Sequence, residues 1–438
     1  MNIEEKFQKA YDSLEKHIES RNKKEQLTAM GYTSNLDLLC DFQVDKLNEL
    51  LAEYMSGEDL TKMKPAKMIR TMQELLETVV YYCINGIGGE ADVEDPELVK
   101  SSFSFKNGMG GTAVQAAMAL AQIGGKTLVH LTDDSKEVCE LLHSSYIHVV
   151  LGNGELGFTD QVISHNPQET HFIVQFKKGD QVRLGEQVIA IPCSNRLILT
   201  KNTVNEYLPL WEPYFKWIEQ NAKQVTSNVL SSFNSILEKE VLKDRLQYVK
   251  NHVEIYRRNN PDGIVYFEDA HYHNEEVRRL CVETLYPCVD ILSMNEEELQ
   301  YTLKEIYGYD VDIDDIYSCI DGVEFLLDKF HIKKGVIVHT KDYAMFVGDS
   351  ENIDIENGLM YGMIMATAKA SHGNYGTKEQ IRQVLELGVS EKGLSNLKKV
   401  EERGYGSRVI LVPTKYIDKP KYTIGLGDSF TGGVQMCF

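Results

Sequence analysis

A glycine-rich stretch near residue 425 carries the residues of this chain that are best suited to chemistry. It reads Thr423-Ile424-Gly425-Leu426-Gly427-Asp428-Ser429-Phe430-Thr431-Gly432-Gly433. We expect a buried strand just before it, at Val409–Pro413, and a helix over Ser429–Cys437. A strand, a glycine turn and a helix N-terminus form an anion site, because unpaired N–H groups converge there and the helix dipole favours negative charge. Gly425 and Gly427 let a phosphate approach the backbone closely.

Asp428 is the unexpected residue in this turn, because a carboxylate beside an anion site repels phosphate. A chemical role explains its presence: it takes a proton from an attacking hydroxyl while the N–H groups stabilise charge on the phosphoryl group. A structural role explains it too, since Asp is a common helix N-cap. The local sequence leaves both interpretations open.

Composition limits the partners of the chain. The 438 residues are enough for one large α/β domain and a smaller one. Lys and Arg number 46 against 66 Asp and Glu, which gives a net charge of −20 and argues against a nucleic-acid partner. An anionic ligand must therefore be bound by local N–H groups, by local Lys or Arg, or by a metal.

The sequence predicts a cytoplasmic protein without a membrane partner. Its first residues, Met1–Lys6, lack the apolar core of a signal peptide, and no apolar run approaches the ~18 residues of a membrane span. Eight scattered cysteines without a C-x-x-C pair indicate reduced thiols. We expect a monomer or a small homo-oligomer.

Strands alternate with helices over the second half of the chain. The expected strands are Gln224–Leu230, Gly263–Glu268, Val289–Ser293 and Gly335–Thr340. This alternation predicts an α/β fold with a mostly parallel sheet and helices on both faces.

The remaining segments predict a second, smaller domain. Residues 145–205 contain several short strands of a different pattern, and with 41–104 they are expected to form an inserted lid domain. The large domain is then expected to consist of residues 1–40, 105–144 and 206–438.

Polar residues stand at the carboxyl ends of the expected strands, where ligands bind in such sheets. They are Asp37, Ser231, Glu268, Asn295, His339 and Asp428. Glu268 and Glu298 are suited to hold Mg²⁺ through water, as hard carboxylate ligands do. The alternative for Glu296–Glu298 is a charged first helical turn that the helix dipole favours.

Several motifs together resemble the ribokinase superfamily and, within it, the ADP-dependent sugar kinases, which include archaeal-type glucokinases and phosphofructokinases. Val412–Thr414, Lys419-Pro420 and Thr423–Asp428 resemble the C-terminal end of that family. Gly31–Asp37 is similar to its first strand motif, Gly110-Gly111 to its second substrate-side glycine pair, and Asn295–Glu298 to its N-x-x-E metal motif. The resemblance covers nearly the whole chain.

The resemblance implies a ribokinase-like fold with a lid, and transfer of a phosphoryl group from a nucleotide, with ADP favoured, to a hydroxyl of a glucose-like sugar or of fructose 6-phosphate. Asp428 takes the place of the catalytic base, with Gly425 and Gly427 beside it. The implied substrate-binding residues are Asn35, Asp37, Glu90, Gly110, Gly111 and Asn234. The implied nucleotide-binding residues are His339, Thr340, Val412, Pro413 and Gly427. The implied metal residues, for Mg²⁺, are Glu268, Glu298 and Asp428.

The chain departs from the family pattern at two places. The His of the family's H-x-E motif is replaced by Tyr266, and the Ser-Gly pair before the family's sugar-contacting Gln reads Ser231-Ser232-Phe233-Asn234. In the family a lid carboxylate accompanies an unphosphorylated sugar, so Glu90 favours a glucose-like acceptor. Two alternatives are an ATP-dependent ribokinase-type sugar or nucleoside kinase, and a non-catalytic sugar- or nucleotide-binding protein, against which Asp428 argues.

Overall fold

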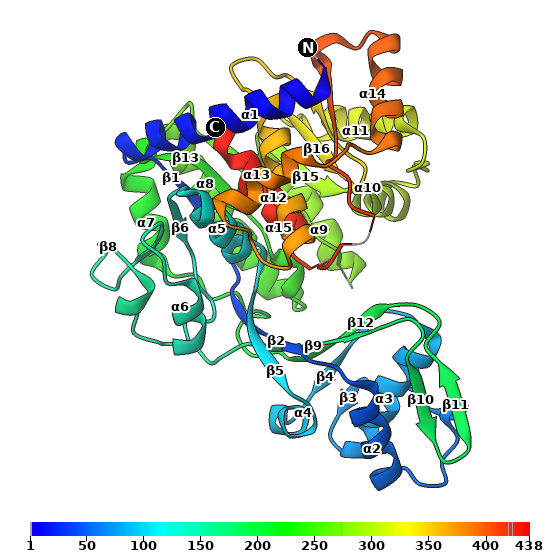
Figure 1. The fold of residues 1–438 in the computed structure, drawn as a ribbon. Coiled ribbons are helices and arrows are strands. Elements are labelled where there is room, and N and C mark those ends of the chain that lie inside the picture. Colours follow the sequence, from blue (N-terminus) through cyan, green and yellow to red (C-terminus); the bar gives the residue numbers. More distant parts are fainter. Residues whose placement is uncertain (1, 273, 419, 423) are drawn as a thin grey trace.

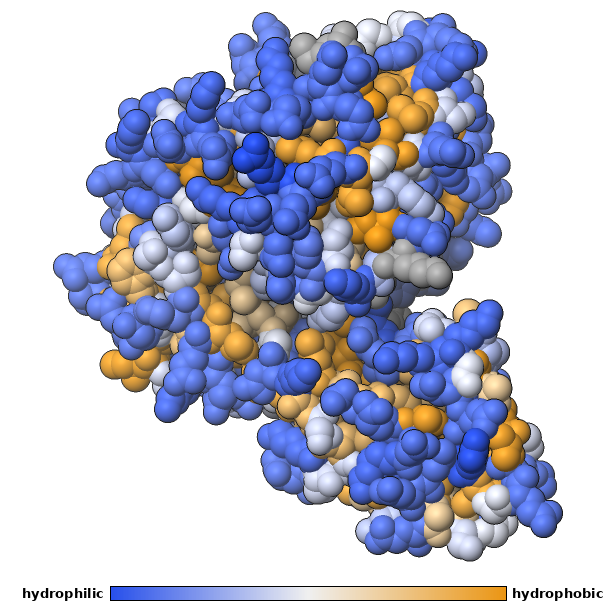
Figure 2. Space-filling model, viewed as in Figure 1, coloured by the Kyte–Doolittle hydropathy of each residue, from blue (hydrophilic) through white to orange (hydrophobic). Residues whose placement is uncertain are grey.

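The computed structural model describes residues 2–272, 274–418, 420–422 and 424–438. Lys419 and Thr423 of the glycine-rich motif therefore lie outside the described residues. The chain forms a large domain and a smaller lid domain, which Figure 1 shows below the large one. Extended strands join the two, and the surface is hollowed where they meet (Figure 2).

Within these described residues, the sheet of the large domain has ten strands in the order β18-β17-β16-β15-β14-β13-β1-β6-β7-β8. The strands from β16 to β7 pair in parallel, and β8, β17 and β18 each pair antiparallel with a neighbour. Their bounds are β1 Leu27–Met30, β6 Thr127–Val129, β7 Ile147–Val150, β8 Leu156–Gly157, β13 Val225–Leu230, β14 Ile264–Glu268, β15 Ile291–Asn295, β16 Gly335–His339, β17 Tyr343–Gly348 and β18 Val409–Pro413.

Helices cover both faces of this sheet. One face packs against α1 (Ile3–Lys23), α5 (Thr112–Ile123), α12 (Ile355–His372) and α15 (Leu426–Val434). The other packs against α7 (Glu212–Gln220), α8 (Lys239–Asn259), α9 (Glu275–Leu285) and α11 (Ile316–Phe330). Tyr266 belongs to the first core and its neighbours Val265 and Phe267 to the second, as the alternation of a strand requires. The predicted fold class is confirmed.

Four further helices in the described part of the chain belong to the large domain. They are α6 (Lys136–Leu142), α10 (Glu296–Tyr301), α13 (Lys378–Gln383) and α14 (Glu391–Arg403). Among the described residues no helix is long and apolar enough to cross a membrane, and the eight cysteines, all of them described, form no disulfide.

The lid domain is built on a second sheet, which in the described part of the chain has six strands in the order β3-β4-β12-β9-β2-β5. Their bounds are β2 Asn35–Cys40, β3 Met68–Ile69, β4 Gly89–Val93, β5 Phe105–Gly110, β9 Thr170–Phe176 and β12 Asn195–Lys201. A hairpin of β10 (Gln181–Leu184) and β11 (Gln187–Ala190) and the helices α2 (Val44–Tyr54), α3 (Met72–Asn85) and α4 (Pro96–Ser102) pack around it.

The strand pairing differs from the predicted domain boundaries in two places. Strands β2 and β5 were expected in the large domain, but they pair with each other in the lid sheet. Strands β7 and β8 were expected in the lid, but in the large sheet β7 pairs with β6 and β8 pairs with β7. Short apolar strands look alike in either sheet, so only long-range pairing decides their place.

Glu169 forms hydrogen bonds with the segments that connect the two domains. Its carbonyl accepts from Leu36 N, and its carboxylate accepts from Thr203 N at 2.7 Å and from Val204 N at 2.9 Å. The crossing points are thus held in register just beside Asn35 and Asp37.

Candidate active site

Helix α15 begins earlier than the sequence predicted. It starts at Leu426 instead of Ser429, and its N-cap is Gly425, whose φ of 66° lies in the left-handed region. Asp428 is thus the third residue of the helix, so the N-cap interpretation of Asp428 is wrong. The N–H groups of the first turn have no acceptor within the helix, which makes this turn an anion site.

Gly425 is required by its surroundings as well as by its φ. A Cβ built on it would overlap Gln115 Oε1 and lie 2.5 Å from Lys369 Nζ. The bare turn therefore allows two polar side chains of other helices, α5 and α12, to lie directly against it.

Asp428 is half-buried, and burial raises the pKa of its carboxyl above the ordinary value. The positive charge of Lys369 and a hydrogen bond from Thr112 lower that pKa in part, while the charge of Glu268 raises it further. A carboxyl whose pKa lies above that of free Asp is a better proton acceptor, which suits a general base.

Asn35 and Asp37 form a buried polar pair in β2 of the lid sheet. Asn35 Nδ2 donates to Asp37 Oδ1 at 2.7 Å, and the side chains are only 3% and 6% exposed. Burial raises the pKa of Asp37 to about 6, although the charge of His171 lowers it in part. The sequence placed these residues at the end of the first strand of the main sheet; that strand is β1, and the pair lies in the next strand.

Gly110 makes room for this pair. Gly110 lies opposite Asn35 in the pairing of β5 with β2, and a Cβ there would overlap Asn35 Nδ2 and Asp37 Oδ1. Gly111 has a φ of 102° and leads into α5. Gly110 ends strand β5 and lies against the polar pair, whereas a Cβ on Gly111 would meet the backbone of Thr33 and Ser34.

His171 was missed from the sequence, although its strand was predicted. It lies beside Asp37 in the register, with Nδ1 3.2 Å from Asn35 Nδ2 and 3.8 Å from Asp37 Oδ1, and with Nε2 3.3 Å from Glu169 Oε1. Burial alone would lower the pKa of His171, but the hydrogen bond to Glu169 and the charges of Asp37 and Glu90 raise it above the ordinary value. His171 is therefore protonated more readily than a free imidazole.

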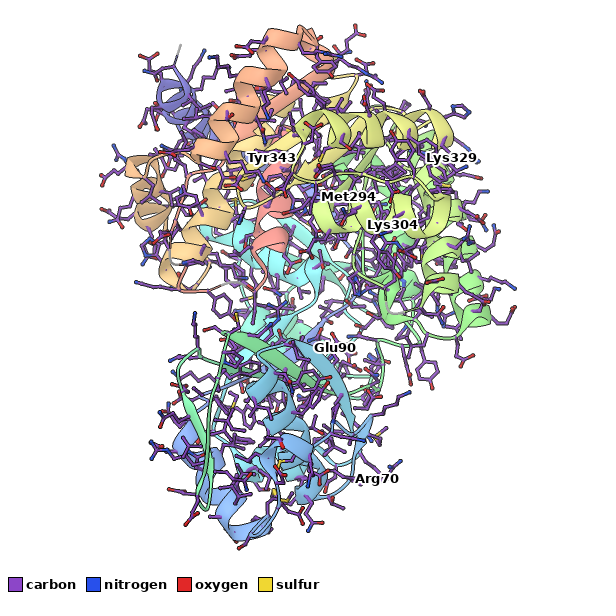
Figure 3. All side chains as sticks on the ribbon, turned by 90° about the vertical axis from the view of Figure 1, so that its right-hand side faces the viewer. Arg70, Glu90, Met294, Lys304, Lys329 and Tyr343 are labelled. Carbon is purple, nitrogen blue, oxygen red and sulfur yellow. The ribbon has the colours of Figure 1, made fainter. Side chains whose placement is uncertain are left out.

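Glu90 projects from the same face of the lid sheet. The register aligns Asp37, His171, Thr200 and Asp92 across four strands, and Glu90 is two residues from Asp92 on β4. Side chains two residues apart share a face. Glu90 is exposed and lies on the side of the lid that faces the large domain (Figure 3).

Tyr422, a residue of the large domain, lies close to this face of the lid sheet. The hydroxyl of Tyr422 has a pKa raised to about 12 by burial, and the charges of Asp37 and of Arg196, on β12, also shift it. Asp37 in turn has Asp428 and Lys369 among its charged neighbours. The polar pair of the lid and the glycine turn of α15 therefore face one another.

A cluster of carboxylates lies beside the glycine turn at the ends of β14 and β15. Glu268 Oε1 is 3.0 Å from His339 Nε2, and its Oε2 accepts from Thr431 Oγ1 at 2.8 Å. Glu298 caps the first turn of α10, because its Oε2 accepts from Asn295 N while its own N–H donates to Asn295 Oδ1. The structure thus gives Glu298 a capping role in the first helical turn, and this role does not exclude a metal role.

The donor set of this cluster fits a divalent cation held through water. Burial raises the pKa of Glu298 to about 8, and the charges of Asp269 and Glu268 raise it as well. A hard cation would offset this repulsion. No three His, Cys, Asp or Glu side chains of the described residues are grouped to bind a metal directly. Tyr266, in place of the family His, lies with its hydroxyl 3.4 Å from Glu268 Oε2.

A cavity of about 490 Å³ opens beside the glycine turn. His339, Thr340 and Gly427 line it, together with Phe430 and the segment Thr414–Asp418. Val412 and Pro413 do not line it, because they belong to β18, where Val412 is fully buried. The cavity is lined by the residues that follow 412–413, and a nucleotide-binding role of Val412 and Pro413 stays a prediction.

Asn234 is not joined to the other site residues by a hydrogen bond in the described part of the chain. Its Nδ2 donates to His271 O at 3.1 Å, in the turn after β13. Ser231 Oγ donates to Gly31 O and lies 3.1 Å from Ser232 Oγ. The turn that was expected to carry a sugar contact is held by contacts to the backbone instead.

The mostly parallel sheet ends in a glycine turn that holds a carboxylate of raised pKa, and the smaller domain presents a polar pair to that turn. This arrangement is suited to phosphoryl transfer. Known proteins place the chain more narrowly. The family model described as "ADP-specific Phosphofructokinase/Glucokinase conserved region" matches residues 26–434. The chain therefore belongs to the ADP-specific phosphofructokinase/glucokinase family, whose members are carbohydrate kinases.

Individual relatives agree with this assignment. The chain is 24% identical to an ADP-specific phosphofructokinase of Pyrococcus furiosus, over 93% of this chain and 96% of that protein. It is 26% identical to an ADP-dependent glucose/glucosamine kinase of the same organism, over 92% of each. The solved structure of a last common ancestor of ADP-dependent phosphofructokinases from Methanosarcinales has the same fold, with a TM-score of 0.80, 22% identity, and coverage of 100% of this chain and 98% of that one.

Proposed function

We propose that this protein transfers the terminal phosphoryl group of ADP to a hydroxyl of an unphosphorylated, glucose-like sugar and releases AMP. The observation that carries the proposal is the position of Asp428, in the first turn of α15 and facing Asp37 of the lid. Proton acceptor, anion site and sugar-binding carboxylate are then in one place, as phosphoryl transfer requires.

The chain's own residues account for each part of the transfer. Asp37 and Asn35 hold the sugar hydroxyls, and Asp428 takes the proton of the attacking hydroxyl as its oxygen forms the new bond to phosphorus. The bond between that phosphorus and the oxygen that bridges to AMP breaks, and AMP leaves with the electron pair. The N–H groups of Leu426, Gly427 and Asp428 stabilise the charge on the phosphoryl oxygens.

Glu268 and Glu298 are the residues that would hold Mg²⁺ through water, with Asp428 nearby. When bound, the ion would offset the charge of the nucleotide phosphates. The cavity lined by His339, Thr340 and Phe430 is open to the glycine turn and suits the nucleotide. We propose that the six-stranded domain acts as a lid, whose closure would exclude water from the phosphoryl group.

The acceptor is assigned from Glu90. This carboxylate lies on the site-facing side of the lid and acts electrostatically on His171, beside the sugar pair. A carboxylate there repels a sugar phosphate and accepts hydrogen bonds from a free sugar hydroxyl. One observation favours fructose 6-phosphate as a second candidate: Arg196, on the same face of β12, is an exposed cation.

A panel of donors and acceptors tests the proposal. The purified protein is given ADP or ATP with Mg²⁺ and either glucose, glucosamine, fructose 6-phosphate or adenosine, and sugar phosphate and AMP are both quantified. We expect glucose and ADP to give the highest kcat/KM, with one AMP formed per sugar phosphate. A preference for ATP would establish the ribokinase-type alternative, and a preference for fructose 6-phosphate would overturn the assignment of Glu90. Nucleotide or sugar binding without turnover would show a binding protein.

A further inference from the structure

A single lysine interrupts the apolar helix α12. Lys369 follows the segment Leu359–Ala368, in which every residue except the half-buried Ala366 is buried, and is itself only 3% exposed. Lysine is almost never buried to this degree unless it is paired. In the described part of the chain no carboxylate forms an ion pair with Lys369, so its charge must be stabilised in another way.

Neutral groups hold the ammonium in place. Lys369 Nζ donates to Gln115 Oε1 at 2.7 Å and lies 4.1 Å from the centre of the Tyr375 ring. The hydroxyl of Tyr375 lies 3.3 Å from the same Gln115 oxygen. An ammonium has three N–H donors, and among the described residues only Gln115 accepts a hydrogen bond from Lys369, which leaves donors for another acceptor.

The ammonium lies against the glycine turn of α15. A Cβ on Gly425 would stand 2.5 Å from Lys369 Nζ. The charges of Asp428 and Asp37 both act on Lys369: burial lowers the pKa of the amine to about 8, and these two carboxylates raise it in part. Lys369 is therefore a mostly charged group between the residue that takes the proton and the residue that holds the sugar.

We propose that Lys369 is a further catalytic residue, whose ammonium contacts the phosphoryl group while it passes from the nucleotide to the sugar. This inference rests on the proposed function. Negative charge on the phosphoryl oxygens must be stabilised beside the N–H groups of α15, and Lys369 lies at that turn without an anionic partner of its own. A fixed cation in a site with little water stabilises negative charge more strongly than a cation in solution does, and its surroundings need no reorganisation during the reaction.

The arrangement also explains why neutral side chains, and not an acidic one, hold Lys369. A carboxylate in ion-pair contact would neutralise the charge that the phosphoryl group requires. Gln115 and the ring of Tyr375 fix the position of the ammonium and leave its charge available.

Two substitutions separate the charge from the hydrogen bond. Lys369→Met removes both, and Lys369→Gln keeps a donor without the charge. We expect both to lower kcat by about 10²–10³-fold, the effect of removing one group that stabilises the transition state. Equilibrium Kd values for ADP and for the sugar, measured by calorimetry, should change less than about threefold, since the contact is made during transfer.

The control removes a buried cation remote from the site. Arg21 donates to Gln435 O and Phe438 O and is 7% exposed, so Arg21→Met should lower the melting temperature and leave kcat within threefold. The inference is overturned if Lys369→Gln keeps its turnover, if the loss lies in sugar or ADP affinity alone, or if melting temperature and activity fall together as in a merely unstable protein.

The wild-type protein is assayed first, which separates the two proposals. Without turnover of any sugar by the wild type, the proposed function fails and the role of Lys369 fails with it. With an active wild type and active Lys369 variants, only the role of Lys369 is wrong.

Discussion

Asp428→Asn should abolish most of the turnover of this protein and leave its fold and its affinities nearly unchanged. Asn has the size and shape of Asp but cannot take a proton at neutral pH. Loss of a general base typically costs about 10²–10⁴-fold in rate, which corresponds to about 2.7–5.5 kcal/mol of activation free energy.

The expected change in stability is small for structural reasons. Asp428 is the third residue of α15 and not its cap, so the substitution removes an interaction with the helix dipole of about 0.3–1 kcal/mol. Burial raises the pKa of this carboxyl, so its ionised form costs folding free energy that the neutral amide does not. These two effects oppose each other, and the melting temperature should move by only a few degrees.

The assay measures kcat with saturating ADP, Mg²⁺ and sugar, together with ADP binding by calorimetry and the melting temperature. Asp315→Asn serves as the matched control, because Asp315 caps α11 through Tyr317 N, and α11 lies on the other face of the sheet. ADP should bind the Asp428 variant as tightly as the wild type or more tightly, since a negative charge beside the phosphates is gone. A variant that keeps most of its turnover would refute the base assignment.

Further substitutions test the surroundings of this residue. Gly425→Ala should lower stability by at least about 1 kcal/mol in thermal or urea unfolding and reduce kcat, because φ is 66° and the new Cβ overlaps Gln115; an unchanged enzyme would mean that the turn relaxes freely. Glu298→Gln should raise the Mg²⁺ concentration needed for half-maximal rate more than it changes sugar affinity; an unchanged Mg²⁺ titration would leave Glu298 a capping residue only. Glu90→Gln should raise KM for glucose and improve the rate with fructose 6-phosphate, and equal effects on both sugars would contradict the charge argument. The kcat/KM for sugar should rise with pH through about 6, because the ionised form of Asp37 binds hydroxyls better and its pKa is raised to about 6. Because the folded-state pKa lies above that of free Asp, the free energy of unfolding should fall as the pH rises from about 4 to 6. Asp37→Asn should remove this inflection, and an inflection that survives would belong to another group.

The architecture of the large domain was predictable because its signals are local. Each strand from β13 to β16 is a short apolar run followed by a helical pattern, and that alternation implies a parallel sheet whatever the distant contacts are. The glycine turn of α15 and the capping box of Asn295 with Glu298 are equally local, because both lie within a few residues of sequence. The carboxyl ends of the strands then bring Glu268, Asn295 and His339 together, as the sequence predicted.

The membership of strands in the two sheets was not predictable from local pattern. Strand β2 has the same apolar character as a main-sheet strand, and its pairing with β5 and β9 is fixed by residues 65 or more positions away. The start of α15 was missed for a related reason. Glycines weaken a helix prediction. Here Gln115 and Lys369 approach Gly425 closely, and the helix begins three residues earlier than predicted.

The sequence by itself determined the candidate chemistry of this protein: a glycine turn before a helix, a carboxylate within it, acidic residues at strand ends and an acidic composition. Only the tertiary structure decided which distant groups act on that turn. Lys369 and Gln115 are 254 residues apart and meet through one hydrogen bond, and His171 meets Asn35 across paired strands. Long-range contacts of this kind produce no periodic pattern in the sequence, because they depend on how helices and strands pack and not on spacing along the chain.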